Sequence, residues 1–378
     1  MKTIQLVKHK NTDWIYIGKK LKLNNPLVLV FGDRVMLEDV NIYKELRCKF
    51  PTGHLVFGST SGDITAHVVD DESITVTAIE FEKTKFDIKT SNVLNSDLNS
   101  FKTGSDLVSQ FLKDNLKLIF VISEGSFING SQLTKGMNVA STSDNLLITG
   151  GLCGDAARFE KTVASYNENP KPGEIVAIGF YGDTFEASFS IHGGWTPFGP
   201  ERIVTKSESN ELFELDNKPA LDLYKKYLGD KSNELPGAAL LYPLNVKSED
   251  ERQSFVRTIL NIDEEKNTMI LAGDIPENSR VQLMMTNVDN IANASERAAR
   301  QALEFRKNKP QLALLVSCIG RKLVLDQRVE EEIEEVVDVL GEDTVICGFY
   351  SYGEIAPFHG EHDCQLHNQT MAITLISE

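Results

Sequence analysis

The motif [Ser/Thr]-x-Gly-[Asp/Glu]-Ile occurs twice in this 378-residue chain, and its surroundings limit the possible folds more than any other sequence feature. The copies cover residues 60–64 and 351–355. Each follows a short apolar run, a helical pattern and a second apolar run, and each precedes another strand-like segment. These segments lie at 26–31, 36–50, 54–58 and 73–81 for the first copy, and at 311–319, 327–340, 344–349 and 371–377 for the second. The pattern predicts a repeated unit of strand, helix, strand, turn and strand.

Two weaker copies of the motif extend this prediction. One lies at 154–156, after the apolar run at 118–123, and the other lies at 273–275. We expect four related units in two lobes, giving a mixed α/β (α+β) fold in which mixed sheets carry helices on their outer faces. The alternative for the weaker copies is an ordinary turn, because glycine accepts the positive φ that many Gly-Asp turns require.

The middle of the chain indicates a boundary between the lobes. A polar stretch covers 205–215, and the helical pattern at 219–228 has proline at its first turn and ends before a glycine. We place the boundary near Asn217. Farther on, the acidic helix at 327–340 is expected to expose one charged face.

Charge and apolar patterning exclude several classes of protein. The chain has 39 Lys and Arg residues against 55 Asp and Glu residues, a formal charge of −16, which disfavours nucleic acid as a partner. It has no apolar run of membrane-spanning length and no secretory pattern at its start, so we expect a cytoplasmic protein without membrane insertion. The five cysteines form no C-x-x-C pair and are expected to be reduced thiols.

The acidic residue after each motif glycine is a candidate for ligand binding. Asp63, Asp155, Asp274 and Glu354 would share one location if the lobes faced each other. Glycine lets a ligand approach the backbone, and the neighbouring carboxylate supplies negative charge. This arrangement predicts recognition of an ammonium group.

Basic and aromatic residues are candidates for the remainder of a zwitterionic ligand. Arg158, Arg202 and Arg321 could each bind a carboxylate in a bidentate manner. Trp195 is a candidate apolar wall. The alternative for each arginine is a salt bridge at the surface or between lobes.

The last unit adds a polar group to this site. Tyr352 lies in the motif, and His367 and Asn368 stand just before the final strand-like segment. They are candidates for a polar rim around the ligand. The alternative is that His367 and Asn368 hydrogen-bond to buried loop backbone.

Catalytic and metal-binding patterns are weak. The histidines and acids at 359–367 have a spacing that matches no known metal motif, so crowding on a polar loop is the favoured interpretation. Cys153 is the one thiol in a glycine-rich turn, and without an identified histidine base it does not indicate an enzyme. We therefore expect a non-catalytic protein with no required cofactor.

Several segments together resemble the FIST (F-box and intracellular signal transduction) family. They are 58–64, 150–162, 193–229, 272–284, 317–328 and 348–358, with 366–371 near the end of the chain. The resemblance implies an N-terminal FIST domain at 26–217 and a C-terminal FIST domain at 218–360, with 361–378 as its closing strand. Relatives often have glutamate where this chain has Asp63, so a contact made by that longer acid is in doubt.

The resemblance also implies a function. It implies a cytoplasmic sensory module for signal transduction that binds small ligands, amino acids among them. A separate histidine kinase, chemoreceptor or cyclic-dinucleotide enzyme would then receive the signal. Two alternatives remain: a haem-based nitric oxide sensor with His192, His367, His54 or Cys153 as axial ligand, and a ligand-free interaction scaffold that uses the acidic segment at 328–340.

Overall fold

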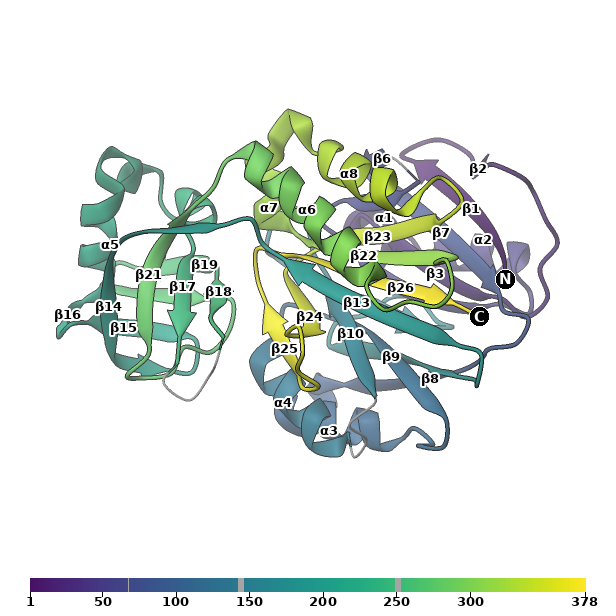
Figure 1. Ribbon diagram of the computed structural model, residues 1–378, viewed down its shortest axis with the longest axis horizontal. Helices are drawn as coiled ribbons and strands as arrows, with labels where there is room; N and C mark the ends of the chain where they lie inside the picture. Colours follow the sequence, from purple (N-terminus) through teal and green to yellow (C-terminus); the bar gives the residue numbers. More distant parts are fainter. Residues whose placement is uncertain (67, 142–145, 249–252) are drawn as a thin grey trace.

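The computed structural model describes residues 1–66, 68–141, 146–248 and 253–378. Its fold is mixed α/β, as predicted, and Figure 1 shows a larger and a smaller lobe. Within the described residues, no helix combines the length and apolar character needed to cross a bilayer.

Three six-stranded sheets form the larger lobe. The first has the order β11-β4-β3-β7-β1-β2, with β1 (Lys2–His9), β2 (Ile15–Ile17), β3 (Leu27–Gly32), β4 (His54–Ser59), β7 (Ser73–Glu80) and β11 (Ala164–Tyr166). The second has the order β25-β24-β10-β9-β12-β8, with β8 (Lys85–Asn92), β9 (Leu116–Ser123), β10 (Leu147–Leu152), β12 (Glu174–Tyr181), β24 (Gly353–Pro357) and β25 (Cys364–His367). The third has the order β13-β26-β22-β23-β5-β6, with β5 (Asp63–Thr65), β6 (Val68–Asp70), β13 (Glu186–His192), β22 (Leu312–Cys318), β23 (Val345–Ser351) and β26 (Met371–Ser377).

The three sheets share one arrangement of strands. In each sheet a parallel pair, β3 and β4, β9 and β10, or β22 and β23, lies beside two antiparallel strands. The short strand after each glycine turn then crosses to a neighbouring sheet: β5 pairs with β23, β11 with β4, and β24 with β10. This exchange ties the three sheets together where their parallel strands end.

Alternation along the strands explains how the layers pack. On β3, Leu27, Leu29 and Phe31 point into the core shared by the three sheets, whereas Val28 and Val30 face the helices outside. Burial on both faces accounts for the continuous apolar runs in the sequence. Phe31 meets Phe349 of the third sheet with ring centroids 4.7 Å apart.

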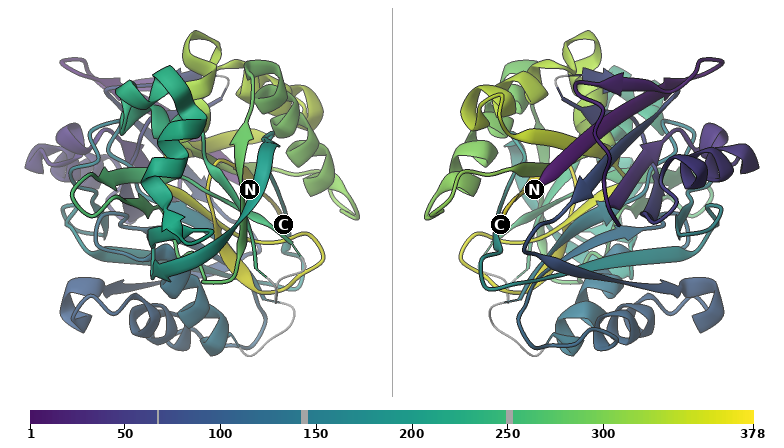
Figure 2. Two further views of the ribbon diagram at one scale, coloured as in Figure 1. Left: turned by 90° about the vertical axis from the view of Figure 1, so that its left-hand side faces the viewer. Right: turned by 90° about the vertical axis from the view of Figure 1, so that its right-hand side faces the viewer.

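Helices cover the outer face of each sheet (Figure 2). They are α1 (Arg34–Leu37) and α2 (Val40–Lys49) on the first sheet, α3 (Ser100–Ser109) and α4 (Gly130–Ala140) on the second, and α6 (Val288–Leu303) and α8 (Glu331–Leu340) on the third. The predicted helix at 36–50 is divided because Asp39 caps α2 by accepting a hydrogen bond from the amide of Asn41. A short helix, α7 (Ile319–Leu325), follows β22, and 3₁₀ turns lie at η1 (Val93–Ser96) and η4 (Asp326–Arg328).

The smaller lobe is a separate sheet with its own core. Its strands have the order β18-β17-β21-β14-β15-β20-β19, and β16 pairs with β15. The elements are β14 (Thr196–Glu208), β15 (Glu211–Leu215), β16 (Lys218–Pro219), α5 (Ala220–Leu228), η2 (Gly229–Glu234), η3 (Gly237–Leu241), β17 (Leu244–Lys247), β18 (Phe255–Arg257), β19 (Ile259–Asp263), β20 (Thr268–Leu271) and β21 (Arg280–Met285).

The distribution of units differs from the expected two in each lobe. The larger lobe holds three equivalent sheets, and the turn at 273–275 lies between β20 and β21 of the smaller lobe, outside any strand-helix-strand unit. The polar stretch at 205–215 is likewise not a linker, because it forms most of the β14–β15 hairpin. An exposed hairpin alternates polar and apolar side chains, which made it look like a loop.

Candidate functional site

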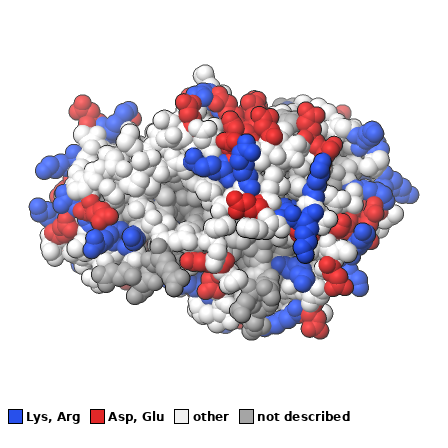
Figure 3. Space-filling view, viewed as in Figure 1, with Lys and Arg blue, Asp and Glu red and all other residues white. Residues whose placement is uncertain are grey.

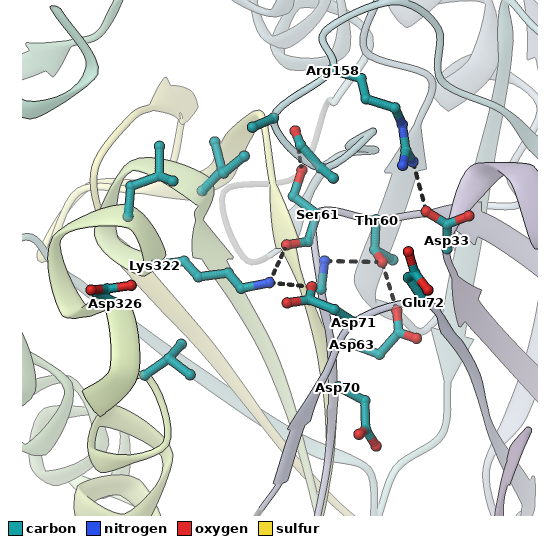
Figure 4. A pocket seen from close by; sticks show the side chains of 16 residues that line it. Asp33, Thr60, Ser61, Asp63, Asp70, Asp71, Glu72, Arg158, Lys322 and Asp326 are labelled. Carbon is teal, nitrogen blue, oxygen red and sulfur yellow. Dashed lines mark hydrogen bonds and ion pairs between the residues drawn. The ribbon is translucent and has the colours of Figure 1, made fainter. Parts of the chain in front are cut away.

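The cavity of interest lies where the three sheets meet. It has a volume of about 440 Å³ and opens beyond the ends of β3, β4, β10 and β22 (Figure 4). Loops at the carboxyl ends of parallel strands commonly build binding sites, because the sheet holds them rigidly. Ile319, Leu323 and Val329 supply an apolar wall.

Asp63 is the most enclosed acidic group of this cavity. Its side chain is 1% exposed, and it accepts hydrogen bonds from the hydroxyls of Thr60 at 2.6 Å and Ser73 at 2.7 Å. Burial raises the pKa of Asp63 to about 7, although the two hydroxyls and the Lys322 charge act in the opposite direction. Gly62, with φ +131°, leaves room for the Lys322 ammonium group, since a Cβ there would lie 2.5 Å from Nζ.

Two cations of the cavity wall already have partners. Lys322 donates to the carbonyl of Ser61 at 2.9 Å and pairs with Asp71. Arg158 lies 2.6 Å from Asp33 and 2.6 Å from Asp155. Figure 4 shows Arg158 and Lys322 reaching into the site from different segments.

Acidic side chains outnumber the cations around the cavity. Besides Arg158 and Lys322, the lining has the acidic residues Asp33, Asp63, Asp70, Asp71, Glu72 and Asp326. Within the described ranges, four of these acids form no salt bridge: Asp63, Asp70, Glu72 and Asp326. Burial and neighbouring acids raise the pKa of Asp70, as expected where negative charge is in excess.

Asp155 lies behind the cavity and holds its wall. It is fully buried and accepts from Arg34 at 2.9 Å, from Arg158 at 2.7 Å and from the amide of Lys161 at 3.3 Å. Burial would raise the pKa of Asp155, but these hydrogen bonds lower it overall. Asp155 therefore positions Arg158.

Tyr352 supports the same loop from the third unit. Its hydroxyl donates to the carbonyl of Ala156 at 3.0 Å and accepts from the amide of Phe159 at 3.2 Å. The rings of Tyr352 and Phe159 stack with centroids 4.6 Å apart. Tyr352 thus positions the backbone before and after Arg158, although its own side chain does not line the cavity.

Glu354 repeats the hydrogen bonding of Asp63 outside the cavity. It is fully buried and accepts from the hydroxyls of Ser351 at 2.6 Å and Thr370 at 2.7 Å, and from the amide of Thr370. Burial raises its pKa to about 7. In both strong motif copies the acid therefore joins the turn to the start of the next strand, so the shorter Asp63 keeps this contact.

His367 and Asn368 satisfy buried backbone. Nε2 of His367 lies 3.0 Å from the carbonyl of Ala356, and the amide of Asn368 donates to the carbonyl of Tyr352 at 3.5 Å. Burial lowers the pKa of His367 to about 4. Neither side chain lines the cavity.

The other predicted residues lie apart from it. Arg321 is fully buried with Glu332, and Trp195 donates to the carbonyl of Gln369 at 3.1 Å. Arg202 belongs to the smaller lobe, where it pairs with Asp216 at 2.9 Å. Of the predicted residues, the fold brings Asp63 and Arg158 to the cavity, with Asp155 and Tyr352 behind them.

Asp274 joins the two lobes. Its carboxylate accepts from Asn129 at 2.7 Å and Gln132 at 2.5 Å, at the start of α4, and lies 3.6 Å from Lys135. These contacts place a negative charge at the amino end of a helix, a favourable position. They lower the pKa of Asp274, while burial acts in the opposite direction.

Replacing Asp274 with alanine is expected to destabilise the docking of the smaller lobe by about 1–3 kcal/mol, because two amide donors lose a charged acceptor. Thermal unfolding and protease cleavage at 193–195 and 286–288 would measure this. The depressed pKa of Asp274 means that its contribution is present above the ordinary value of 3.8 and disappears as the pH falls through the folded value. If Asp274→Ala lowered the stability by the same amount at pH 7 and at pH 2, the contribution of an ionised Asp274 carboxylate would be contradicted.

Several cavity residues escaped the sequence analysis. They are Asp33, Asp70, Asp71, Glu72, Lys322 and Asp326. Asp33 directly follows a buried strand, a position that could have been noticed. The others reach the cavity only because β5 and β6 join the third sheet beside α7.

The candidate haem ligands do not fit a haem site. His192 lies 2.7 Å from Gln301, His54 lies 2.6 Å from Tyr166, and His367 and Cys153 are buried. None of the four lines the principal cavities of the described residues. No group of three or more His, Cys, Asp or Glu side chains in these residues could hold a metal ion.

Comparisons with known proteins place the chain in a family. The FIST N domain matches residues 26–218, and the FIST C domain matches residues 220–357. Uncharacterized protein MJ1623 of Methanocaldococcus jannaschii is 23% identical over 393 residues, covering 92% of this chain and 74% of that protein. The crystal structure of a cyanuric acid hydrolase from A. caulinodans is 8% identical in sequence, and the alignment covers 93% of this chain and 90% of that chain with a TM-score of 0.35. The two domain matches span most of the sequence, and the chain belongs to the FIST family.

Proposed function

We propose that this chain is a cytoplasmic sensor that binds a small cationic amine in the cavity where the three sheets meet. FIST domains are generally small-ligand sensing domains in signalling. The observation that carries the proposal is the excess of carboxylates around the cavity: four acids have no salt bridge among the described residues, whereas both cations do. A protonated amine would neutralise part of this charge.

The wall favours an amine without a carboxylate. An α-amino acid would need a cation for its carboxylate, and Arg158 and Lys322 would have to leave Asp33 and Asp71. An aliphatic diamine instead places its ammonium groups near carboxylates and its methylene groups against Ile319 and Leu323. Amino acids with a second ammonium group are the next candidates.

One further feature supports a sensor rather than an enzyme. Cys153 is buried, and burial raises the pKa of its thiol, so it is unsuited to nucleophilic attack. Figure 3 shows acidic side chains gathered over the region of α8, where Glu334 and Asp338 are exposed and Glu332 is buried. This acidic face is a surface on which a signalling partner would bind. Transfer of the signal to a histidine kinase, chemoreceptor or cyclic-dinucleotide enzyme forms part of the proposal.

Calorimetric titration and melting temperatures with 1,4-diaminobutane, lysine, glycine and succinate test the ligand class. A ligand at 100 times its dissociation constant adds about 2.7 kcal/mol, which raises the melting temperature by roughly 3–4 °C for a protein of this size. We expect the diamine to give the largest shift and succinate none. Because Asp63 has a pKa of about 7, affinity for the diamine should increase from pH 6 to pH 8, as the carboxylate ionises while the amine stays protonated.

The chain provides a matched pair of variants for this experiment. Asp63→Asn removes a charge from the cavity, whereas Glu354→Gln removes a charge with the same type of hydrogen bonding outside it. We expect diamine binding to be lost in the first variant and kept in the second. Stronger binding of succinate than of the diamine, or equal loss in both variants, would overturn the proposal.

A further inference from the structure

Helix α7 connects the cavity to the smaller lobe. One side of it lines the cavity with Ile319, Lys322 and Leu323. The intervening residues, Gly320 and Arg321, are buried on its other side. In Figure 1, α7 lies between the larger lobe's sheets and the smaller lobe.

Arg321 holds both segments of chain that cross between the lobes. The first crossing joins β13 to β14, and Arg321 donates to its Gly193 carbonyl at 2.5 Å. The second joins β21 to α6, and Arg321 donates to the Ile291 carbonyl in the first turns of α6 at 3.1 Å. Thr286 of the second crossing also donates to Gly194 of the first at 2.8 Å. A displacement of Arg321 would therefore act on both crossings together.

Gly320 provides a second connection. It packs so closely on Gln369 that a Cβ at this position would lie 2.2 Å from the amide nitrogen of Gln369. That nitrogen donates to the Leu240 carbonyl at 2.9 Å and to the Thr258 hydroxyl at 3.1 Å, both in the smaller lobe. Displacement of α7 would therefore disturb a direct contact between the lobes.

The interface between the lobes has the character of a movable contact. Besides Gln369, its polar contacts include Asp274, which lies against α4, and Arg257, which donates to the Leu366 carbonyl at 2.9 Å; Phe358 adds an apolar contact with the core of the smaller lobe. Polar interfaces of this kind permit relative motion of domains more readily than large apolar ones.

We propose that α7 couples the occupancy of the cavity to the orientation of the smaller lobe. An ammonium group held by Asp63, Asp70 and Glu72 repels the neighbouring Lys322 ammonium group, so that α7 shifts while Lys322 stays paired with Asp71. Arg321 and Gly320 move with α7 and alter the contacts with the crossings and with Gln369. The ligand as trigger rests on the proposed function, whereas the mechanical connection does not. A ligand shifts the equilibrium between two lobe orientations only if it binds one orientation more tightly than the other.

A variant without any ligand tests the connection. Lys322→Met removes the hydrogen bond with Ser61 and the ion pair with Asp71, and both of these partners belong to the larger lobe. Amide hydrogen exchange should become about fivefold faster or more in η3 and in both crossings. Lys161→Met, which breaks the ion pair with Glu38 beside the cavity and away from α7, is the matched control and should leave η3 unchanged.

The outcomes separate the two proposals. If exchange rises around Ser61 but stays at the wild-type rate in η3 and both crossings, the coupling is wrong. Lys322→Gln serves the same purpose if the methionine variant does not fold. In a second arm, Gly320→Ala should change the dissociation constant of 1,4-diaminobutane although residue 320 does not line the cavity. If 1,4-diaminobutane does not bind the wild-type protein, the amine proposal is wrong. The hydrogen-exchange result then still tests the coupling by itself.

Discussion

Replacing Arg321 with methionine is expected to lower the free energy of unfolding of the larger lobe by roughly 3–5 kcal/mol. Arg321 is fully buried and donates to Glu332 at 2.6 Å and to Ser295 at 2.7 Å, besides the two crossings. Without the guanidinium group, the buried Glu332 carboxylate keeps only neutral donors, among them Ser317 at 3.0 Å. Urea unfolding followed by circular dichroism would measure the loss.

Two further variants show whether charge or shape causes this loss. Arg321→Lys should recover little, because an ammonium group cannot reach the four acceptor atoms arranged around the planar guanidinium group. The double variant Arg321→Met, Glu332→Gln should recover part of the stability, since it leaves no buried charge. A loss below about 1 kcal/mol in Arg321→Met would contradict the argument. The Arg321–Glu332 ion pair is thus expected to fix the position of α7 and to add little net stability to the fold.

Stability of the folded chain is expected to fall as the pH rises from about 4 to about 7 through Asp63 and Glu354. Each has a folded pKa of about 7, above its ordinary value of 3.8 or 4.5. The folded state therefore binds more protons than the unfolded state within this window, and ionisation favours unfolding. At about 1.4 kcal/mol per pKa unit, each residue contributes a few kcal/mol to this effect.

The variants Asp63→Asn and Glu354→Gln should each be more stable than the wild type at pH 8 and differ least from it near pH 4. Melting temperatures across this range would measure the difference. Glu342→Gln, at an exposed position, is the control and should follow the wild type. Variants that are less stable than the wild type at pH 8 would show that the acids are stabilised in their ionised form. Asp63→Asn should combine greater stability with loss of amine binding, as expected for a group kept for function.

Several elements of the first and third units, and one helix of the smaller lobe, were predictable from the sequence alone. The strands β3, β4, β7, β22 and β26 and the helices α5 and α8 agree with the predicted segments to within a few residues. Local patterns suffice because a strand buried on both faces is continuously apolar and an amphipathic helix has a period near 3.6 residues. The resemblance to the FIST family likewise needed only the sequence.

Only the tertiary structure decided how these elements combine. The strand after each glycine turn joins a different sheet from the strand before it, and no local pattern records such long-range pairing. The four copies of the motif consequently have different outcomes: Asp63 faces a cavity, Asp155 positions Arg158 behind it, Glu354 lies outside it, and Asp274 joins two lobes. The sequence determined which acids follow a glycine turn. The exchange of strands determined which of them a ligand can reach, because it brings α7 and the β5–β6 hairpin to one place.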